Sequence, residues 1–349
     1  MFKSSELRKI DENDIEWQDV LDLLENQGIK LDPFVDHTYS YFEGDKLVGT
    51  ASVAGSTIRS IAIAKHKQGS NTLSEMMNDI MEILYDSGHG NIFIYTKSDA
   101  VRSFQNIGFY EVDRAEVEHD SVVLLERKPD GIRNFVKTIE RLKTGHEEIG
   151  AIVMNANPFT LGHQYLIEYA AAHCDFLYVF VVSTEKSVFP FDTRMNLIKE
   201  GTSHIENVYV LNGGNYIISG ATFPNYFLKA PDSATKLQAK LDITIFARYF
   251  AKALNIKKRF IGTEPYCGTT KIYNETMKEV LTRFGVEVCE IPRKKIGEAP
   301  ISASMVRKFI KEGELKAAKS FVPKTTFDFL VSKDAKPIIE AIQKSDSRH

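Results

Sequence analysis

A polar turn near the middle of the chain has the residue types that bind phosphate. The run NPFTLGH at 157–163 follows an apolar segment and precedes a helical pattern at 164–172. Thr160 can cap that helix and offer its hydroxyl to a phosphate oxygen, and Gly162 lets a ligand or another backbone approach closely. His163 would lie in the first helical turn, where free amides and the helix dipole favour an anion and an imidazole can stabilise developing phosphoryl charge. If this motif stood alone, a helix cap for Thr160 and a half-buried surface position for His163 would explain the two residues better than a phosphate site.

A second candidate anion site lies near the other end of the chain. The run ISASMVR at 301–307 opens a helical pattern with two hydroxyls, Ser302 and Ser304, and a basic residue, Arg307. The surrounding stretch 292–311 holds six Lys or Arg residues against one acid, a net charge of +5, whereas the whole chain carries −3. In isolation such a run would be a solvated helix face with a serine cap. Together with the first motif it indicates a site for a polyphosphate.

The two motifs together resemble the signatures of the nucleotidyltransferase superfamily, whose members transfer adenylyl groups on Rossmann-like domains. The superfamily has an H/T-x-G-H turn after its first strand and an ISSxxxR-like helix start near its end. The matching residues are Thr160, Gly162 and His163 in the first motif and Ser302, Ser304 and Arg307 in the second. Position 303 is Ala where the superfamily usually has Ser or Thr.

Longer runs narrow this resemblance to the citrate lyase ligase family. They are NANPFTLGHQYL at 155–166, FPFDTR at 189–194, ATFPNYFLK at 221–229 and GTEPYC at 262–267. The resemblance covers most of the chain, because that family carries an acetyltransferase-like (GNAT) domain ahead of its nucleotidyltransferase domain. It implies an α/β protein with an N-terminal GNAT-like α+β domain and a C-terminal Rossmann-like domain built on a parallel sheet.

One loop in the first domain bears on a coenzyme A site. A GNAT fold holds the pyrophosphate of coenzyme A on a Q/R-x-x-G-x-G/A loop between its fourth strand and the next helix, where backbone amides bind the anion. Here the strand pattern at 57–64 leads to Gln68, Gly69 and Ser70, the candidate residues for a CoA-like arm. Only Gly69 matches the pattern cleanly. The sequence leaves open whether this domain binds acetyl-CoA, a CoA-like prosthetic arm or no ligand.

The resemblance implies an acid–thiol ligase that uses ATP. Acetate and ATP would give acetyl-AMP and pyrophosphate, and the acetyl group would pass to the thiol of the CoA-like prosthetic group on the acyl-carrier subunit of citrate lyase, which activates the lyase. The implied partners are acetate and this subunit. Mg²⁺ would arrive with the nucleotide, since it seldom has a dedicated protein cage, and no protein residues are expected as metal ligands.

The same resemblance assigns roles to individual residues. Thr160 and His163 would act at the α-phosphate, and Lys186 and Arg194 would clamp a phosphate or the acid, although a structural salt bridge explains either of the last two more simply. These four are the candidate catalytic residues. The candidate ATP-binding residues are Asn155, Asn157, Phe159, Thr160, Gly162, His163, Gly262, Glu264, Ser302, Ser304 and Arg307.

Three other functions fit parts of the pattern. An adenylyltransferase acting on a pantetheine phosphate would release pyrophosphate without acetate. A non-catalytic CoA- or nucleotide-sensing protein would bind its ligand without turnover, and the intact Thr160, His163, Ser302 and Ser304 set speaks against it. An acetyltransferase would use the first domain alone, and the incomplete loop around Gly69 counts against it.

Periodicity divides the chain into two domains with a connecting helix. The first has helical patterns at 11–27, 71–86 and 99–106 among short β-like runs. From residue 149 onward strands and helices alternate, which predicts a parallel sheet with right-handed crossovers and a ligand at the carboxyl ends of its strands. The predicted strands are 38–42, 47–53, 57–64, 91–95, 109–112 and 121–126 in the first domain, and 150–155, 175–182, 207–211, 259–262 and 286–291 in the second. The expected bounds are 1–128, a linker helix at 129–147, and 148–349.

Length and composition exclude several other classes of protein. The chain has 349 residues, of which 43% are hydrophobic and 26% charged, typical of a globular protein with two domains. The net charge of −3 argues against bulk binding of nucleic acid or membranes. The sequence shows no signal-peptide pattern and no apolar run that could span a bilayer. Three scattered cysteines, Cys174, Cys267 and Cys289, fit a reducing compartment, so a cytoplasmic location is expected.

Overall fold

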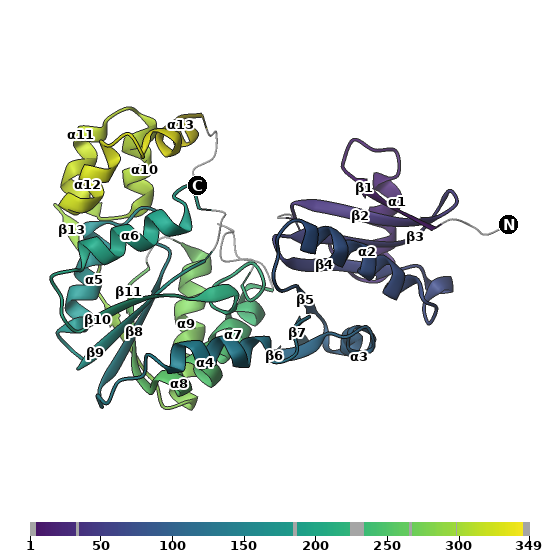
Figure 1. Ribbon diagram of the computed structural model, residues 1–349, viewed down its shortest axis with the longest axis horizontal. Helices are drawn as coiled ribbons and strands as arrows, with labels where there is room; N and C mark the ends of the chain where they lie inside the picture. The colour runs from purple at the N-terminus through teal and green to yellow at the C-terminus, as the bar shows by residue number, and fades with distance from the viewer. Residues whose placement is uncertain are drawn as a thin grey trace. The chain divides into compact units, whose positions relative to one another are not determined.

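The structure is a computed structural model that describes residues 5–32, 35–183, 187–223, 234–264, 267–297 and 299–344 (Figure 1). The chain forms two compact units. The first consists of Met1–Asn134 and Gly220–Pro224, and the second of Phe135–Ser219 and Asn225–His349. Helix α4 (Gly131–Glu140) contains the point at which the chain passes from the first unit to the second.

The first unit is built on a seven-stranded sheet with the order β1-β2-β3-β4-β5-β7-β6. Neighbouring strands are antiparallel except β4 and β5, which are parallel and pair only through Thr57 with Phe93 and Ile58 with Ile94. The strands are β1 (Ser5–Ile10), β2 (His37–Glu43), β3 (Lys46–Ala54), β4 (Thr57–Ile63), β5 (Phe93–Thr96), β6 (Tyr110–Val117) and β7 (Asp120–Glu126), and the helices are α1 (Trp17–Glu25), α2 (Thr72–Asp86) and α3 (Val101–Asn106).

The two faces of this sheet are covered by different helices because the strands alternate their side chains between faces. Apolar residues of α2, among them Met76 and Ile80, pack with Val53 and Ile94 of the sheet. On α1, Val20 and Leu24 pack instead with a separate cluster that contains Ile10 and Phe42. This arrangement confirms the predicted GNAT-like α+β domain.

Two local features of the first unit differ from expectation. The helix predicted from residue 11 begins only at Trp17, because Asp11–Asp14 form a hydrogen-bonded turn and Ile15 is 97% exposed rather than buried. Strand β1 was not expected from the sequence. It lies at the edge of the sheet and only Ile10 is buried, so its apolar and charged residues do not alternate in a regular pattern.

The second unit contains a five-stranded parallel sheet with the order β10-β9-β8-β11-β12. All five predicted strands are confirmed, and their bounds shift by at most three residues. The strands are β8 (Ile149–Met154), β9 (Phe176–Val181), β10 (Val208–Asn212), β11 (Ile256–Gly262) and β12 (Glu287–Ile291). The buried, almost continuous apolar residues of β8 and β9 are typical of strands inside a parallel sheet covered on both faces.

Helices cover both faces of the parallel sheet, which gives the Rossmann-like three-layer arrangement visible in Figure 1. On one face, Ile167 of α5 and Ile198 of α6 pack with Val179 of the sheet. On the other face, Phe180 contacts Phe246 and Phe250 of a π-helical turn that continues α7. The helices are α5 (Leu161–Ala171), α6 (Phe191–Gly201), α7 (Thr235–Ile245), α8 (Lys252–Leu254) and α9 (Gly268–Arg283), with the π-helical turn at Phe246–Ala251.

The strand order places a topological switch point beside β8. This strand comes first in the unit, β9 and β10 follow on one side, and β11 and β12 lie on the other. Strand β8 pairs with β11 only from Ile149 to Ala151. The last three residues of each strand, which the structure describes, do not pair with each other. Ligands of open α/β sheets bind at such a point, beyond the carboxyl ends of the strands.

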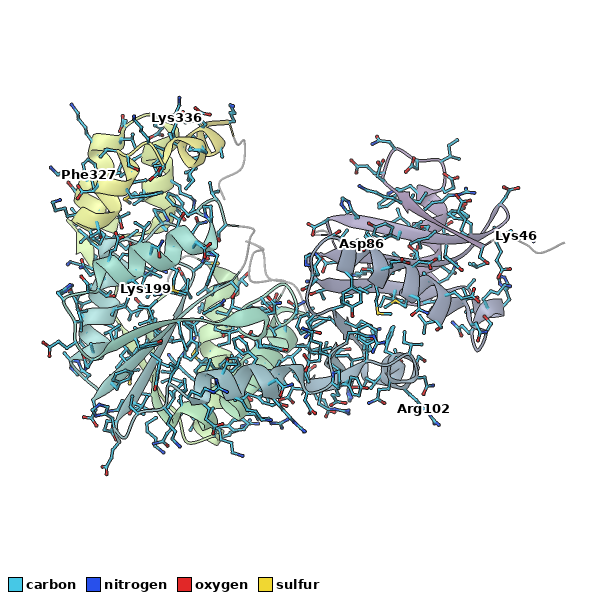
Figure 2. All side chains as sticks on the ribbon, viewed as in Figure 1. Lys46, Asp86, Arg102, Lys199, Phe327 and Lys336 are labelled. Atoms are coloured by element: carbon cyan, nitrogen blue, oxygen red, sulfur yellow. The ribbon has the colours of Figure 1, made fainter. Side chains whose placement is uncertain are left out.

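A small hairpin and four short helices complete the second unit. Phe189, which precedes α6, packs with Val306, Ile310 and Leu330 of these helices. Figure 2 labels Phe327 on α12 and Lys336 at the start of α13. The elements are β13 (Lys295–Ile296), β14 (Ala299–Pro300), α10 (Ala303–Lys311), α11 (Leu315–Ala318), α12 (Lys324–Leu330) and α13 (Lys336–Lys344). None of the helices within the described ranges is both long and apolar enough to cross a membrane.

Candidate functional site

The turn after β8 starts helix α5 with a reciprocal cap. Thr160 is extended, with φ −123° and ψ 166°, and its side chain accepts a hydrogen bond from the His163 amide at 3.4 Å. In return, the Thr160 amide donates to Nδ1 of His163 at 3.1 Å. Ala156, just before the turn, is buried and has a positive φ of 49°, a conformation that costs an L-residue about 1–2 kcal/mol. Such strain is found where the surroundings fix the backbone for a functional purpose.

The cap determines which nitrogen of His163 can act as a donor. Because Nδ1 accepts the Thr160 amide proton, it must carry a lone pair, and the neutral ring therefore holds its proton on Nε2. Within the described part of the chain Nε2 has no hydrogen-bond partner. The half-buried ring stacks on Phe159, with centroids 6.0 Å apart, which fixes its plane. The arrangement holds one N–H donor at the start of a helix, where an anion is favoured.

The pKa of His163 is lowered from 6.5 to about 4, first by burial and second by the nearby positive charge of Arg293. The imidazole is therefore neutral at pH 7. An unfolded chain would protonate this side chain near pH 6.5, so the folded state binds fewer protons between about pH 6.5 and pH 4. The stability that the neutral ring contributes is present above pH 6.5 and is lost as the pH falls towards 4.

This linkage gives a testable pH dependence of stability. We expect the free energy of unfolding of the wild type to fall from pH 7 to pH 4.5 more steeply than that of a His163→Asn variant, which has no titrating ring. Urea unfolding at both pH values measures the two slopes. Equal slopes for the two proteins would show that His163 titrates in the folded state as it does in solution.

Phe159, in the turn before α5, is completely buried. Its ring lies against Gly201 at the end of α6, where an added Cβ would be 2.5 Å from Cε1 and 3.0 Å from Cδ1 of the ring. The absence of a side chain at Gly201 therefore sets the position of Phe159, and through the ring stack that of His163.

We expect Gly201→Ala to destabilise the second unit and to weaken ATP binding. Overpacking costs about 1–3 kcal/mol, which exceeds the gain of about 1 kcal/mol in helix propensity from Gly to Ala. Urea unfolding and the KM for ATP measure the two effects. Gly145→Ala is the matched control, because a Cβ there meets nothing within 4 Å. Equal stability of the two variants would contradict this role of Gly201.

The structure brings the two sequence motifs together although they are about 140 residues apart. Arg307 Nη1 donates to the backbone oxygen of Asn157 in the first turn. A Cβ added at Gly162 would be 3.2 Å from the oxygen of Ile301, just before the second motif. The starts of α5 and α10 are therefore close neighbours, and Gly162 allows this approach because it lacks a side chain.

The start of α10 offers hydroxyls and amides of the kind that bind phosphate. Ser302 is the N-cap and accepts a hydrogen bond from the Met305 amide at 3.2 Å. Ser304 is exposed in the first turn and Ala303 is half-buried beside it. Two helix N-termini that lie next to each other reinforce one another's preference for anions.

Arg307 is a desolvated cation without an acidic partner. Within the described residues it forms no ion pair, and its Nε is buried without a hydrogen-bond partner. Its polar contacts are the Asn157 carbonyl and, at 3.5 Å, the hydroxyl of Ser304. Burial lowers the pKa of the guanidinium. A half-buried charge of this kind is costly unless an anion compensates it, so the site favours a negatively charged ligand.

Strands β11 and β12 lie next to β8 in the sheet order, and the residues that follow them are linked to each other. Arg293, just after β12, donates from Nε to the Thr263 carbonyl at 2.7 Å and forms an ion pair with Glu264. Glu264 also accepts the Cys267 amide at 3.1 Å, at the start of α9. The carbonyl of Gly262 accepts from Asn274. Glu264 thus holds Arg293 at a position from which its charge reaches His163.

Arg194, on α6, contacts the turn after β8 at Asn155. It is 0% exposed, and burial lowers its pKa to about 10. It donates to the Phe189 and Val182 carbonyls and to both oxygens of Asn155, at 2.8–2.9 Å. This geometry favours a positioning role for Arg194 over a direct clamp on phosphate. Lys186, the other predicted clamp, lies outside the described residues.

Asn155 and Asn157 face different partners although they belong to the same turn. The side-chain oxygen of Asn157 accepts the Phe189 amide at 3.0 Å, so this residue joins the turn to the start of α6. The side-chain oxygen of Asn155 accepts from Ser187 at 3.0 Å as well as from Arg194. Sequence reasoning missed Ser187, because nothing in its local sequence signals a contact 32 residues away.

In the first unit, Gln68, Gly69 and Ser70 lie in the loop between β4 and α2, as the sequence indicated. Gly69 has a positive φ of 82°, which explains the need for glycine there. The Ser70 hydroxyl donates to the Lys67 carbonyl at 2.6 Å, and Gln68 donates to the Ile63 carbonyl. Whether this loop binds a ligand stays a prediction.

All three cysteines are half-buried and free. Burial raises the pKa of Cys174 to about 11 and also raises the pKa of Cys289, so both thiols are protonated at pH 7. Across the described ranges no group of three or more His, Cys, Asp or Glu side chains could hold a metal ion.

Comparison with known proteins identifies the family. The family described as the citrate lyase ligase C-terminal domain matches residues 149–330. The chain is 33% identical over 317 residues to the citrate (pro-3S)-lyase ligase of Escherichia coli (strain K12), covering 89% of each chain. It is 36% identical over 290 residues to that of Klebsiella pneumoniae, covering 82% of this chain and 84% of the relative. A solved IAA acetyltransferase from Bacillus cereus ATCC 14579 is 18% identical, with a TM-score of 0.29, over 35% of this chain and 98% of its own. The chain belongs to the citrate lyase ligase family and is a ligase.

Proposed function

We propose that this protein joins acetate to the thiol of the prosthetic group on the acyl-carrier subunit of citrate lyase, with ATP as the energy source and acetyl-AMP as the intermediate. The observation that carries the proposal is the neighbouring pair of helix starts at α5 and α10. They surround a half-buried Arg307 that has no acidic partner among the described residues. A polyphosphate would satisfy both helix ends and this cation.

In the first step, a carboxylate oxygen of acetate attacks the α-phosphorus of ATP. The bond from this phosphorus to the oxygen bridging the α- and β-phosphates breaks, and pyrophosphate leaves with the electron pair. His163 Nε2–H and the capped start of α5 would stabilise the charge on the α-phosphate oxygens. Ser302, Ser304 and Arg307 would bind the β- and γ-phosphates, which become the leaving group.

In the second step, the sulfur of the prosthetic thiol attacks the acetyl carbonyl carbon of acetyl-AMP. The bond between that carbon and the phosphate oxygen breaks, AMP leaves, and the thiol loses its proton to solvent. The reactive thiol belongs to the partner, which fits a chain whose Cys174 and Cys289 thiols are held protonated. We propose that the GNAT-like domain, residues 1–128, binds the CoA-like arm through the Gln68–Ser70 loop, while residues 148–349 activate the acid.

Mg²⁺ would accompany the nucleotide in this scheme. It usually keeps several waters and binds through substrate phosphates and one or two carboxylates. The residues present fit this arrangement, because Arg307 and the starts of α5 and α10 would contact the phosphates that bring the ion. Bound Mg²⁺ would neutralise charge on the departing pyrophosphate. The predicted cytoplasmic location is part of the same proposal.

A pyrophosphate-release assay tests the function. ATP is supplied with or without acetate and with or without deacetylated citrate lyase, and we expect release to require acetate. With ¹⁸O-labelled acetate, one ¹⁸O atom should appear in AMP, because the acid oxygen that attacks phosphorus stays on AMP when the thiol takes the acetyl group. Release that ignores acetate and follows an added pantetheine phosphate would instead indicate an adenylyltransferase.

A further inference from the structure

Asn155 has the geometry of a fixed hydrogen-bond donor for the acid substrate. We propose that its side-chain amide binds the carboxylate of acetate, and that Arg194 and Ser187 are positioning residues that set the orientation of this amide. The inference rests on the proposed function, because it assigns the acid to one side of the ATP site. It also changes the expected role of Asn155, which the sequence suggests as an ATP-binding residue.

The hydrogen bonds around Asn155 determine which end of its amide is free. Arg194 Nη1 donates to Oδ1 at 2.9 Å and to the backbone oxygen of the same residue at 2.8 Å. The Ser187 hydroxyl donates to Oδ1 at 3.0 Å. An arginine has no acceptor, so the atom it contacts must be the oxygen, and the amide cannot be flipped. The NH₂ group therefore points away from both partners.

This NH₂ group is available to a ligand. Asn155 is half-buried, and its Nδ2 has no hydrogen-bond partner in the described part of the chain. The atom is also not one of the described polar atoms that are both buried and without a partner. It must therefore reach solvent. It lies one residue beyond the carboxyl end of β8, the central strand beside the switch point. A ligand of an open α/β sheet is expected at this position.

Its location separates it from the groups that would bind phosphate. Asn155 is connected to the segment after β9, since Arg194 also donates to the Val182 carbonyl at 2.8 Å. The candidate phosphate ligands are grouped elsewhere, where α10 meets the start of α5 and where Arg293, after β12, contacts Thr263 after β11. Attack on the α-phosphorus has to come from the side opposite the leaving pyrophosphate. The β9 side is the one that this geometry leaves for the acid.

A neutral donor also suits the chemistry of the step. A cation that forms an ion pair with acetate would bind it more tightly but would withdraw electron density from the attacking oxygen. An amide holds the carboxylate by a hydrogen bond and leaves more of its charge for the attack on phosphorus. Arg194 contributes without touching the acid. Its guanidinium donates to Oδ1 of Asn155, and its positive charge polarises the amide so that the NH₂ group is a stronger donor.

The test is the isosteric substitution Asn155→Asp. Aspartate keeps an oxygen for Arg194 and Ser187, so the network and the fold should survive, but it replaces the NH₂ donor with a charged acceptor. We expect the KM for acetate to rise at least about tenfold, since a hydrogen bond to a charged group contributes about 1.5–3 kcal/mol. The KM for ATP should change less than about threefold. Asn155→Ala should raise the KM for acetate in the same direction.

Asn207→Asp is the matched control. Asn207 uses its Nδ2 on the Ala171 and Cys174 carbonyls, at 2.9 and 3.2 Å, just before β10 at the amino end of the sheet. This change should lower stability without raising the KM for acetate. For the positioning residues, Ser187→Ala should raise the KM for acetate about two- to fivefold with kcat unchanged, which a purely structural defect would not do.

Several outcomes would overturn the inference. An unchanged KM for acetate in both Asn155 variants would do so, and so would equal increases for acetate and ATP, which would place the amide on the nucleotide. If the wild type released no acetate-dependent pyrophosphate, the proposed function would fail first. In that case NMR would still test the role of Asn155, by measuring the binding of ¹³C-labelled acetate in the presence of a non-hydrolysable ATP analogue. The inference predicts weaker acetate binding by Asn155→Asp than by the wild type, and equal binding would overturn it.

Discussion

Replacing His163 by Asn is expected to lower kcat for pyrophosphate release by about 10²–10³-fold, the usual effect of removing one donor that stabilises developing charge. The Asn oxygen can take over the role of Nδ1 and accept the Thr160 amide, so the cap of α5 is kept. What is lost is the Nε2–H donor. The free energy of unfolding at pH 7 should therefore change by less than about 1 kcal/mol, the usual contribution of a cap.

His163→Gln is the complementary variant. The glutamine amide can approach the position of Nε2 and donate to a phosphate, but it cannot accept the Thr160 amide. We expect it to retain more of the rate than His163→Asn and to be the less stable of the two. Steady-state kinetics and urea unfolding on both proteins separate catalysis from capping. If His163→Asn kept a rate within about threefold of wild type, the assigned role in catalysis would be wrong.

Replacing Arg307 by Met is expected to raise the KM for ATP by about 10–100-fold. Charge-assisted hydrogen bonds contribute about 1.5–3 kcal/mol each, and 1.4 kcal/mol corresponds to a factor of ten. The KM for acetate should change little, because Arg307 contacts the Asn157 carbonyl and Ser304 and does not contact Asn155, the proposed ligand of the acid. The free protein should not be destabilised by more than about 1 kcal/mol, since the variant removes a desolvated charge that has no acidic partner among the described residues.

The neighbouring Lys308→Met is the control for this experiment. Lys308 is exposed on the same helix, and its ion pair with Glu312 is long, at 3.8 Å. Surface pairs of this kind contribute little. Isothermal titration with ATP and thermal unfolding on both variants measure affinity and stability independently. Wild-type affinity in Arg307→Met would show that the basic residue at the start of α10 does not bind the triphosphate.

The strands of the second unit could be predicted because buried parallel strands are short, continuous apolar runs, as in β9. The order of these strands in the sheet could not be predicted, because it depends on the side of β8 to which each connecting helix brings the next strand. Strand β1 was missed for the opposite reason. It lies at an edge of the sheet with only Ile10 buried, so burial imposes little pattern on its residues.

The candidate site was predictable where one local segment supplies both the turn and the helix start, as with Thr160 and His163. It was not predictable where distant residues decide a role. The Arg293 charge was counted within a basic cluster, but Glu264, 29 residues earlier, pairs with it. Arg194 was a candidate clamp for a phosphate or the acid, with a structural salt bridge as the simpler explanation. Tertiary packing buries it completely and directs it to Asn155. Contacts across 30–40 residues leave no periodic trace in the sequence.

The division of the chain between the two units has a consequence for its synthesis. The first unit includes Gly220–Pro224, and Arg59 of β4 donates to the Gly220 carbonyl while it pairs with Asp32 at 2.5 Å. A ribosome must therefore produce β8, β9 and β10 before the first unit has all of its residues. The last part of the first unit is supplied only after three of the five strands of the parallel sheet have been synthesised, so we expect the first unit to reach its final fold when synthesis of the second is well advanced.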